Sequence, residues 1–418
     1  MRSCDVVIIG AGPAGSSAAI TLARLGYSVA LLDKEQFPRE KLCGDFINPI
    51  NWPILRALGV EKEILSRARQ RVTGFRITSV AGDEAECPLP LTIGPSTRAP
   101  ALAGGSCLGF RPTGVLEGAT GLPVGLHEPF GVGLSRAALD HILLEKAQNE
   151  NVTVLQNCRI KRLTRKETPW HLEFDHGGTI ETLRARLLIG ADGRHSWVAH
   201  HLGLTRSADM RGRAVAFQRH LECRGGFGER VEIHLFPGGY AGLLGLGGNL
   251  INLCLAVDKD RLPDDQPFAR LLESRLPLNP HLKTILNRSE PAGELRSTYP
   301  VYFSPRRSYG DNVLLVGDAA RVNEPVSGEG IYFALKSGLL AAETIDATFR
   351  VGDFSAARLR AYETACRSEF RLRRGVNALI RTLIYRPALA SPLIRFSAKR
   401  RRLLDSIVRT VCLPNAAP

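Results

Sequence analysis

Apolar residues near the start of the chain form a short continuous run that ends in glycines. Residues 5–9 read Asp-Val-Val-Ile-Ile, a glycine-rich stretch occupies 10–15, and small and apolar residues follow it. A second apolar run, 28–33, ends in an aspartate. Continuous apolar runs of this length are typical of strands that are buried on both faces. The pattern therefore predicts a strand, a helix and a second strand in an open α/β sheet.

A similar pattern returns late in the chain. Residues 313–317, Val-Leu-Leu-Val-Gly, predict another buried strand, and Asp318 lies where this strand becomes a loop. Ligands of open α/β sheets bind at the ends of such strands. We therefore interpret Asp318 as a ligand contact, with the capping of a turn as the alternative. Apolar residues then repeat at the spacing of one buried helix face: Ile331, Ala334, Leu335, Gly338, Leu339, Ala342 and Ile345.

The predicted helix is entered through Ser-Gly-Glu-Gly, residues 327–330. A helix N-terminus has unpaired N–H groups and the positive end of the helix dipole. Glycines at this place let an electron-rich group approach the amides closely. The segment therefore predicts a binding site for such a group.

The rest of the chain divides into a β-rich part and a helical part. Residues 75–80, Phe-Arg-Ile-Thr-Ser-Val, and 251–257, Ile-Asn-Leu-Cys-Leu-Ala-Val, have the alternation or the apolar run of strands. Residues 355–384 are rich in helix formers, and no proline interrupts the stretch before Pro387. We therefore expect a β-rich second domain and a helical C-terminal region.

Length and cysteine usage limit the class of protein. The 418 residues, of which 44% are hydrophobic, are enough for two or three structural units. Nine cysteines are scattered without a close Cys-x-x-Cys pair, which argues against a zinc site and a disulfide framework. We therefore expect no metal and a reducing, cytoplasmic location.

The formal net charge of +14 predicts attraction to anionic surfaces. Nucleic acid is a disfavoured partner, because no known binding module is recognised and aromatic residues make up only 6% of the chain. Residues 395–411 predict a basic helix with an apolar face. The two interpretations of this helix are peripheral contact with a membrane and packing on its own domain.

The glycine-rich stretch fits the fingerprint of a dinucleotide-binding turn. Gly10 would permit the tight turn, Gly12 would let a pyrophosphate approach the backbone, and Gly15 would let the helix pack close to the strand. Asp33 ends the second strand, where a carboxylate can accept hydrogen bonds from a ribose. An acid at this place would repel a 2′-phosphate, so the fingerprint favours FAD or NAD over NADP without choosing between the two.

Three further segments, in the expected order, resemble the flavin-dependent hydroxylase superfamily, whose type member is para-hydroxybenzoate hydroxylase. They are residues 131–147 with Arg136, the motif Ala191-Asp192-Gly193, and the motif Gly317-Asp318. The resemblance implies that FAD is the cofactor and that Arg136 contacts its diphosphate. It also implies that Asp318 holds the sugar-alcohol chain of the flavin. The residues implied near FAD in the second and third motifs are Asp192, Gly193, Gly317, Asp318, Pro325, Gly328 and Gly330, and the backbone of 328–330 would face the isoalloxazine ring.

Two segments resemble the geranylgeranyl reductase branch of this superfamily: residues 37–49, Phe-Pro-Arg-Glu-Lys-Leu-Cys-Gly-Asp-Phe-Ile-Asn-Pro, and the helix start at 327–338. The resemblance implies that Cys43 and Gly44 lie by the flavin ring, with Arg39 and Lys41 nearby. A small buried filler is the alternative for Cys43. Tyr240, in a Phe-Pro-Gly-Gly-Tyr stretch that is also similar to that branch, and Glu329 are further candidates for the reactive pocket.

The chain lacks two features of the flavoprotein families to which it was compared. Reductases of that branch often carry a tryptophan two residues after the tyrosine, where this chain has Gly242. The absence of that wall puts an isoprenoid substrate in question. The Trp-x-Trp-x-Ile-Pro signature of flavin-dependent halogenases is missing, which argues against halogenation.

The resemblance implies an α/β fold with a Rossmann-like FAD-binding domain of the GR2 type, a β-rich substrate domain and a helical C-terminal tail. We expect the FAD-binding domain at 1–75, 106–205 and 290–345, the substrate domain at 76–105 and 206–289, and the tail at 346–418. The substrate would lie between the sheet of the second domain and the flavin.

The predicted function is that of an FAD-dependent oxidoreductase that reduces carbon–carbon double bonds of an apolar, isoprenoid or polyketide-like small molecule. NAD(P)H bound transiently, or a ferredoxin, would supply the electrons. A monooxygenase shares every FAD motif and is the alternative. A non-catalytic flavoprotein that docks on a membrane through its basic tail is a third hypothesis.

Overall fold

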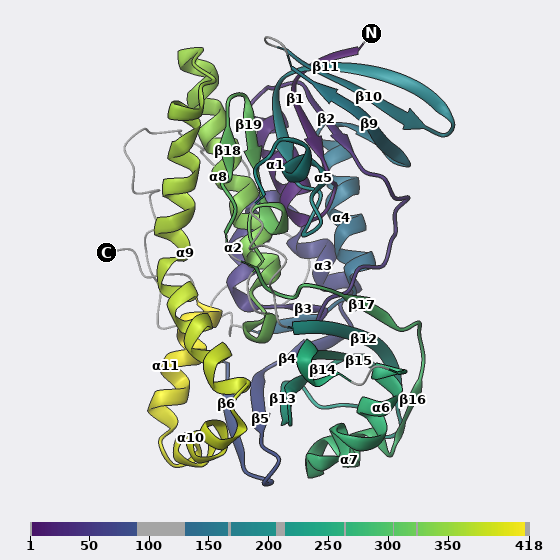
Figure 1. Cartoon of the computed structure of the whole chain (residues 1–418), viewed down its shortest axis with the longest axis vertical. Helices are drawn as coiled ribbons and strands as arrows, with labels where there is room; N and C mark the ends of the chain where they lie inside the picture. The colour runs from purple at the N-terminus through teal and green to yellow at the C-terminus, as the bar shows by residue number, and fades with distance from the viewer. Residues whose placement is uncertain are drawn as a thin grey trace, which may run out of the picture.

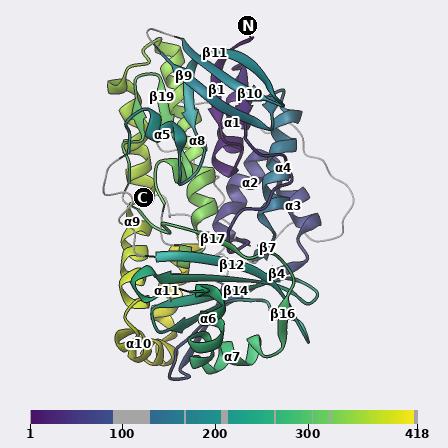
Figure 2. The ribbon, with the colours of Figure 1, turned by 45° about the vertical axis from the view of Figure 1, so that its right-hand side comes forward.

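The computed structural model describes residues 2–89, 130–165, 169–205, 214–262, 265–303, 305–322 and 325–413. It has two lobes, each built on a sheet, and a long helix that runs beside both (Figures 1 and 2). The expected domain boundary between 105 and 106 lies outside the described residues.

The first lobe is an α/β domain around a sheet that is parallel at its centre. Its strands follow the order β18 (Tyr309–Gly310), β19 (Val313–Leu315), β11 (Thr179–Gly190), β1 (Arg2–Ile9), β2 (Val29–Leu32) and β8 (Thr153–Leu155). The antiparallel strands β10 (Trp170–His176) and β9 (Cys158–Thr164) extend it from β11. The apolar runs predicted the strands β1 and β19. Both strands pair with β11, so their carboxyl ends lie on either side of its carboxyl end.

The central sheet is buried on both faces, and side chains alternate between these faces along β1. Val6 and Ile8 point to a core shared with most of the helices, and Val7 and Ile9 point to a core shared with β9, β10 and α5. The helices of this lobe are α1 (Pro13–Arg24), α2 (Trp52–Leu58), α3 (Glu61–Arg67), α4 (Arg136–Asn149), α5 (Trp197–His201) and α8 (Gly330–Val351).

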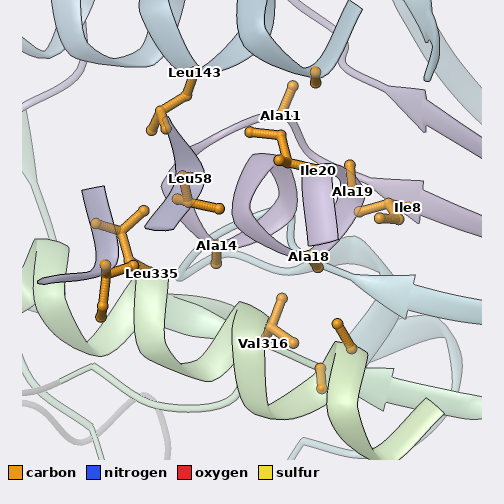
Figure 3. Close-up of a cluster of buried hydrophobic side chains, with 14 of the residues drawn as sticks. Ile8, Ala11, Ala14, Ala18, Ala19, Ile20, Leu58, Leu143, Val316 and Leu335 are labelled. Carbon is orange, nitrogen blue, oxygen red and sulfur yellow. The ribbon is translucent and has the colours of Figure 1, made fainter. Parts of the chain in front are cut away.

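Small residues let α1 and α8 pack closely (Figure 3). A Cβ atom at Gly338 would lie 2.4 Å from the carbonyl oxygen of Ala14, and Ser17 donates a hydrogen bond to the Leu335 carbonyl at 2.9 Å. Real Cβ atoms do not approach an oxygen so closely, so a glycine is required at 338. The contact fixes the start of α8 against the glycine turn at the start of α1.

The second lobe is a mostly antiparallel sheet. Its strands follow the order β16 (Ser289–Pro291), β12 (Ala214–Cys223), β15 (Leu250–Asp258), β14 (Gly239–Gly247), β13 (Arg230–Phe236), β5 (Gly74–Thr78) and β6 (Glu84–Pro88), and β17 (Arg296–Thr298) also pairs with β12. Helices α6 (Pro267–Ser274) and α7 (Pro280–Leu286) pack on one face. A small sheet of β3 (Phe46–Ile47), β7 (Gly131–Gly133) and β4 (Gln70–Val72) lies between the lobes.

Three expected domain boundaries differ from the structure. The boundary at 75 falls inside β5, which belongs to the second sheet from Gly74 on. β16 and β17 pair with β12, so the second sheet continues to Thr298 instead of ending at 289. The boundary at 345 falls inside α8, because the buried face of this helix continues through Thr348 and the helix ends at Val351 before Gly352, whose φ is +75°.

The C-terminal region is helical, as α9 (Ala356–Ile384), α10 (Pro387–Lys399) and α11 (Arg401–Cys412). The prediction of a single helix over 395–411 is wrong, because the chain leaves helical geometry at Arg400, with φ −125° and ψ 71°. Val408, Val411 and Cys412 of α11 are buried in a cluster with Phe46 and Val72. These three side chains of α11 therefore pack on the protein itself.

Candidate functional site

The glycine turn at the start of α1 leaves space on one side only. Gly10 has a φ of +106°, and a Cβ atom at Gly15 would lie 1.9 Å from the Gly10 carbonyl oxygen. At Gly12 a Cβ atom would meet no atom nearer than 3.7 Å, and Gly12 caps α1 without a side-chain hydrogen bond. The N–H groups of the first helical turn therefore face open space.

Two guanidinium groups flank this open space. The nearest atoms to a Cβ at Gly12 would be Nη2 of Arg39, at 3.7 Å, and Nη2 of Arg136, at 3.9 Å. Both arginines contact the buried Asp140, at 3.2 Å from Arg39 and 2.7 Å from Arg136. Arg39 also lies 3.9 Å from an oxygen of Asp33. The two guanidinium groups lie beside free amides, and guanidinium and amide N–H groups are the donors that suit a diphosphate.

Asp33 lies at the end of β2, next to the same turn. Its two carboxylate oxygens accept hydrogen bonds from the backbone N–H groups of Ala11, at 2.7 Å, and Glu35, at 3.0 Å. Each oxygen has a second lone pair, so it can also accept a hydrogen bond from a ribose hydroxyl. The contact of Asp33 with a ribose remains a prediction.

A large cavity runs from the glycine turn to the face of the second sheet. It contains about 1550 Å³ of empty space, counted out to its open mouth. The predicted site residues that line it are Gly12, Lys41, Cys43, Gly44, Arg136, Gly193, Tyr240, Asp318, Pro325, Gly328 and Gly330. Apolar side chains of the second lobe, among them Phe75, Ile233, Leu243 and Leu255, form the opposite wall.

The segment before α8 brings backbone to this cavity. Gly317 has a φ of +56° and Gly328 a φ of +66°, and a Cβ at Gly328 would lie 2.8 Å from the ring of Phe46. Asp318 lines the cavity, and one of its oxygens lies 3.6 Å from Nη2 of Arg194. The helix N-terminus at Gly330 therefore points into the cavity with no side chain in the way.

Asp192 does not line the cavity, contrary to its predicted contact with the cofactor. Its carboxylate accepts hydrogen bonds from Ser196 Oγ, at 2.6 Å, and from the N–H of Val198, at 3.0 Å. Through these two hydrogen bonds Asp192 fixes the start of α5. The neighbouring Ala191 and Gly193 reach the cavity instead.

Glu329 is also outside the cavity, so its expected place in the reactive pocket is wrong. The carboxylate is 1% exposed and forms an ion pair with Arg373 of α9 at 2.9 Å, and Asn377 donates a second hydrogen bond at 2.9 Å. Burial raises the pKa of Glu329, and Arg373 opposes this shift. The side chain turns toward α9, where Arg373 and Asn377 contact its two carboxylate oxygens.

The Cys43 loop is held by side chains of the second sheet. The N–H of Cys43 donates to Gln218 Oε1 at 3.2 Å, and its carbonyl accepts from Asn252 Nδ2 at 2.8 Å and from the Cys254 thiol at 3.0 Å. Gln218 and Cys254 are directly opposite each other on β12 and β15. Sequence reasoning missed these residues, although polar groups within apolar strands were a visible signal.

Asp45, two residues later in the same loop, is also bound to β12. It is buried, has a φ of +55°, and accepts a hydrogen bond from His220 at 2.9 Å. The hydrogen bond with Asp45 raises the pKa of His220, and burial raises the pKa of Asp45. His220 therefore has a charged partner and is not free to hold a metal ion or react with a ligand.

Lys41 and Cys43 place an amine and a thiol at the cavity. Burial and the nearby Arg136 guanidinium lower the pKa of Lys41, and burial raises the pKa of the Cys43 thiol. Cys43 is therefore an uncharged S–H group at neutral pH. Its position on the cavity wall argues against the alternative of a mere filler in the core.

The residues present fit FAD. Free amides at the start of α1 and the guanidinium groups of Arg39 and Arg136 suit its diphosphate. Asp318 and the start of α8 also line the cavity, where amides at a helix N-terminus would stabilise the negative charge of a reduced flavin. Among the described residues, no group of three or more His, Cys, Asp or Glu side chains is arranged to hold a metal ion.

Comparisons with known proteins point to the same cofactor. Residues 3–233 match the model of a protein family described as FAD binding domain. The chain is similar to menaquinone reductase of Mycolicibacterium smegmatis, with 28% identity over 372 residues that cover 84% of this chain and 78% of the relative. It is also similar to digeranylgeranylglycerophospholipid reductase 1 of Methanococcoides burtonii, with 26% identity over 378 residues that cover 88% and 80% of the two chains.

Solved structures share the fold. A geranylgeranyl bacteriochlorophyll reductase-like protein of Thermoplasma acidophilum superposes with a TM-score of 0.69, at 18% identity, over 100% of this chain and 94% of that one. The flavin-dependent halogenase CmlS superposes with a TM-score of 0.72, at 21% identity, over 89% of this chain and 63% of that one. At these identities the likeness concerns the fold and does not select a reaction.

Proposed function

Because this chain belongs to the family of FAD-binding domains, we propose that it uses FAD to reduce carbon–carbon double bonds of an apolar, isoprenoid or polyketide-like substrate. The match to the family confirms the predicted FAD-binding α/β fold. The chain is an FAD-dependent oxidoreductase, in line with the reductases to which it is similar over most of its length.

The observation that carries the proposal is the make-up of the cavity. One end is built for an anionic dinucleotide, by the Gly12 amides and the Arg39–Arg136 pair. The other end is an apolar wall of the second sheet. A site of this kind can bring a flavin and a hydrocarbon into one cavity.

A second cavity supports a long apolar substrate. It is lined mainly by aliphatic side chains of α9, α10, α11 and the second sheet, and it shares the residues Phe75, Ile233 and Val326 with the first cavity. The names of the two relatives, which act on menaquinone and on a digeranylgeranyl lipid, support the same class. Gly242 leaves the wall between Tyr240 and Cys254 open, since a Cβ there would meet only the Cys254 carbonyl oxygen, at 3.9 Å.

In the proposed reaction, bound FAD in its reduced form supplies a hydride to one carbon of the double bond. The chain's own residues orient the two partners and exclude water by the apolar wall. The Cys43 thiol holds a proton at Sγ beside the Arg136 guanidinium and is the proposed donor to the second carbon. NAD(P)H bound transiently, or a ferredoxin, is the proposed source of electrons.

The test is turnover of the flavin-loaded protein under anaerobic conditions. Dithionite-reduced protein is mixed with menaquinone or a geranylgeranyl lipid, and products are analysed by mass spectrometry. We expect hydrogen to be added to a double bond, and Cys43→Ala to lower the rate without loss of bound FAD. Products without added hydrogen from either substrate class would count against the proposal.

The monooxygenase alternative is decided by the same protein in oxygenated buffer. Oxygen consumption that depends on substrate, with an oxygen atom in the product, would establish the alternative in place of the reductase. Slow oxidation of the reduced protein without an oxygenated product would leave the reductase as the proposed function.

A further inference from the structure

Helix α9 carries leucine side chains that the other described residues leave exposed. Leu372 is 60% exposed and Leu379 is 57% exposed. They are seven residues apart in one helix, so they lie on the same face, two turns from each other. Phe396 of α10 is 49% exposed, and the Arg400 guanidinium lies 5.4 Å from its ring centre.

The same helices are strongly basic. Residues 371–413 contain one acidic residue, Asp405, and these basic residues: Arg371, Arg373, Arg374, Arg381, Arg386, Arg395, Lys399, Arg400, Arg401, Arg402 and Arg409. Some of this charge is neutralised, by the Arg373–Glu329 pair and by the pair of Arg395 with Asp83 at 3.0 Å. Five exposed cations form no ion pair within the described part of the chain, and they are Arg371, Arg386, Lys399, Arg400 and Arg402.

We propose that the exposed leucines of α9, together with the exposed side chains of the residues that follow it, dock on the surface of an anionic lipid bilayer. We call this set the α9–α10 surface and define it by Leu372, Leu379, Phe396 and the five exposed cations. Leucine and phenylalanine side chains gain by entering the boundary between headgroups and acyl chains, while arginine and lysine reach the phosphates. Exposed leucines gain nothing by contact with the phosphate backbone of a nucleic acid. The combination of leucines and cations therefore favours lipid over nucleic acid as the partner.

The place of this surface in the fold agrees with such a partner. Figure 1 shows α9 along one side of both lobes, with α10 and α11 beside the β5–β6 end of the second sheet. These three helices form one wall of the second cavity, through Leu383, Ile394 and Ile407 among others. A bilayer bound here would lie against the helices that enclose the proposed substrate space. This last link rests on the proposed function, whereas the docking itself does not.

Docking here would be peripheral. Among the described residues, no helix combines the length and the hydropathy that would let it traverse a bilayer. The apolar face of α11, to which the sequence pointed, is buried in the protein. The exposed side chains of α9 and α10 are therefore the ones that meet the lipid.

Sedimentation with vesicles tests the proposal on the flavin-loaded full chain. Phosphatidylcholine vesicles are compared with vesicles that also contain phosphatidylglycerol. We expect binding to the anionic vesicles only, and weaker binding as salt is added. The double variant Leu372→Glu/Leu379→Glu should bind the anionic vesicles about tenfold more weakly, because it loses apolar insertion and adds repulsion.

Ile180→Glu is the matched control, because Ile180 is 58% exposed but lies in the β10–β11 hairpin of the first lobe. It should bind vesicles as the unaltered protein does, and flavin absorbance and the melting temperature show that each variant is folded. Equal binding of the α9 double variant and the unaltered protein would overturn the proposal. Failure to sediment with anionic vesicles while a DNA duplex is bound would also overturn it and assign the charge to nucleic acid. Neither assay uses turnover, so a negative result leaves the proposed reaction untouched.

Discussion

Glu329 and Arg373 form a buried ion pair that joins the loop before α8 to the end of the chain. Oε1 of Glu329 lies 2.9 Å from Nη1 of Arg373, and the two side chains are 1% and 0% exposed. Arg373 also donates hydrogen bonds to the carbonyl groups of Thr410, Val411 and Leu413 at the end of α11. The Arg373 guanidinium therefore holds both the loop before α8 and the end of α11 in place.

Arg373→Met should lower the free energy of unfolding by about 3–5 kcal/mol, because it leaves the Glu329 carboxylate buried without a counter-charge. Denaturant unfolding of the flavin-loaded variant measures the loss. The double variant Arg373→Met/Glu329→Gln should recover a large part of it, because an amide carries no charge. A double variant that is less stable than the single one would contradict the role given to the ion pair.

Two alanine substitutions in the glycine turn should have different effects. Gly15→Ala should destabilise the protein itself, because its Cβ would lie 1.9 Å from the Gly10 carbonyl oxygen. Gly12→Ala should leave the melting temperature of the FAD-free protein unchanged and lower FAD affinity, because its Cβ enters only the space between Arg39 and Arg136. Thermal melts and flavin fluorescence separate the two. Unchanged FAD affinity in Gly12→Ala would show that the glycine turn does not bind the diphosphate.

Binding of FAD should weaken as pH rises, through Lys41. Burial and Arg136 lower the pKa of this lysine in the protein without cofactor. A diphosphate nearby favours the charged ammonium and raises that pKa. Between the lowered pKa and the ordinary value of about 10.4, binding takes up a proton, so affinity falls by at most about tenfold per pH unit. Fluorescence titration along a pH series measures this slope, which Lys41→Met should flatten. Equal slopes in the two proteins would place Lys41 away from the diphosphate.

Stability should fall as pH rises through the titration of the His220–Asp45 pair. The pKa of His220 is raised by its hydrogen bond with Asp45, so its contribution is present below the unfolded value of about 6.5 and is lost above the folded one. Burial raises the pKa of Asp45, which acts in the same direction. The difference in unfolding free energy between about pH 6 and about pH 9 should be smaller in His220→Gln. A variant with the unaltered pH dependence would show that the pair does not titrate in this range.

Much of the first lobe could be predicted because its signals are local. The apolar runs of β1 and β19, the glycines at 10, 12 and 15, and the periodic face of α8 are all contained in short segments. Helix 355–384 was predicted within one residue at its N-terminus, as α9 begins at Ala356 and ends at Ile384.

The parts that could not be predicted depend on partners distant in sequence. Glu329 turns away from the cavity because Arg373 lies on α9, and nothing near residue 329 indicates this partner. The apolar side of 404–411 resembles a free amphipathic face until α11 is placed against Phe46 and Val72. Gln218 and Asn252 acquire their function through the register of β12 and β15 and the approach of the Cys43 loop.

This last arrangement has a consequence for the exchange of domains between related proteins. The peptide groups of Cys43 belong to the first lobe, but the amides that hold them, Gln218 and Asn252, belong to the second. A chimera that takes its second sheet from a relative would also replace the side chains that hold the Cys43 loop on the cavity wall. If this loop contacts the flavin, as we propose, such an exchange would change cofactor reactivity together with substrate choice, and retaining Gln218 and Asn252 is the condition for changing substrate choice alone.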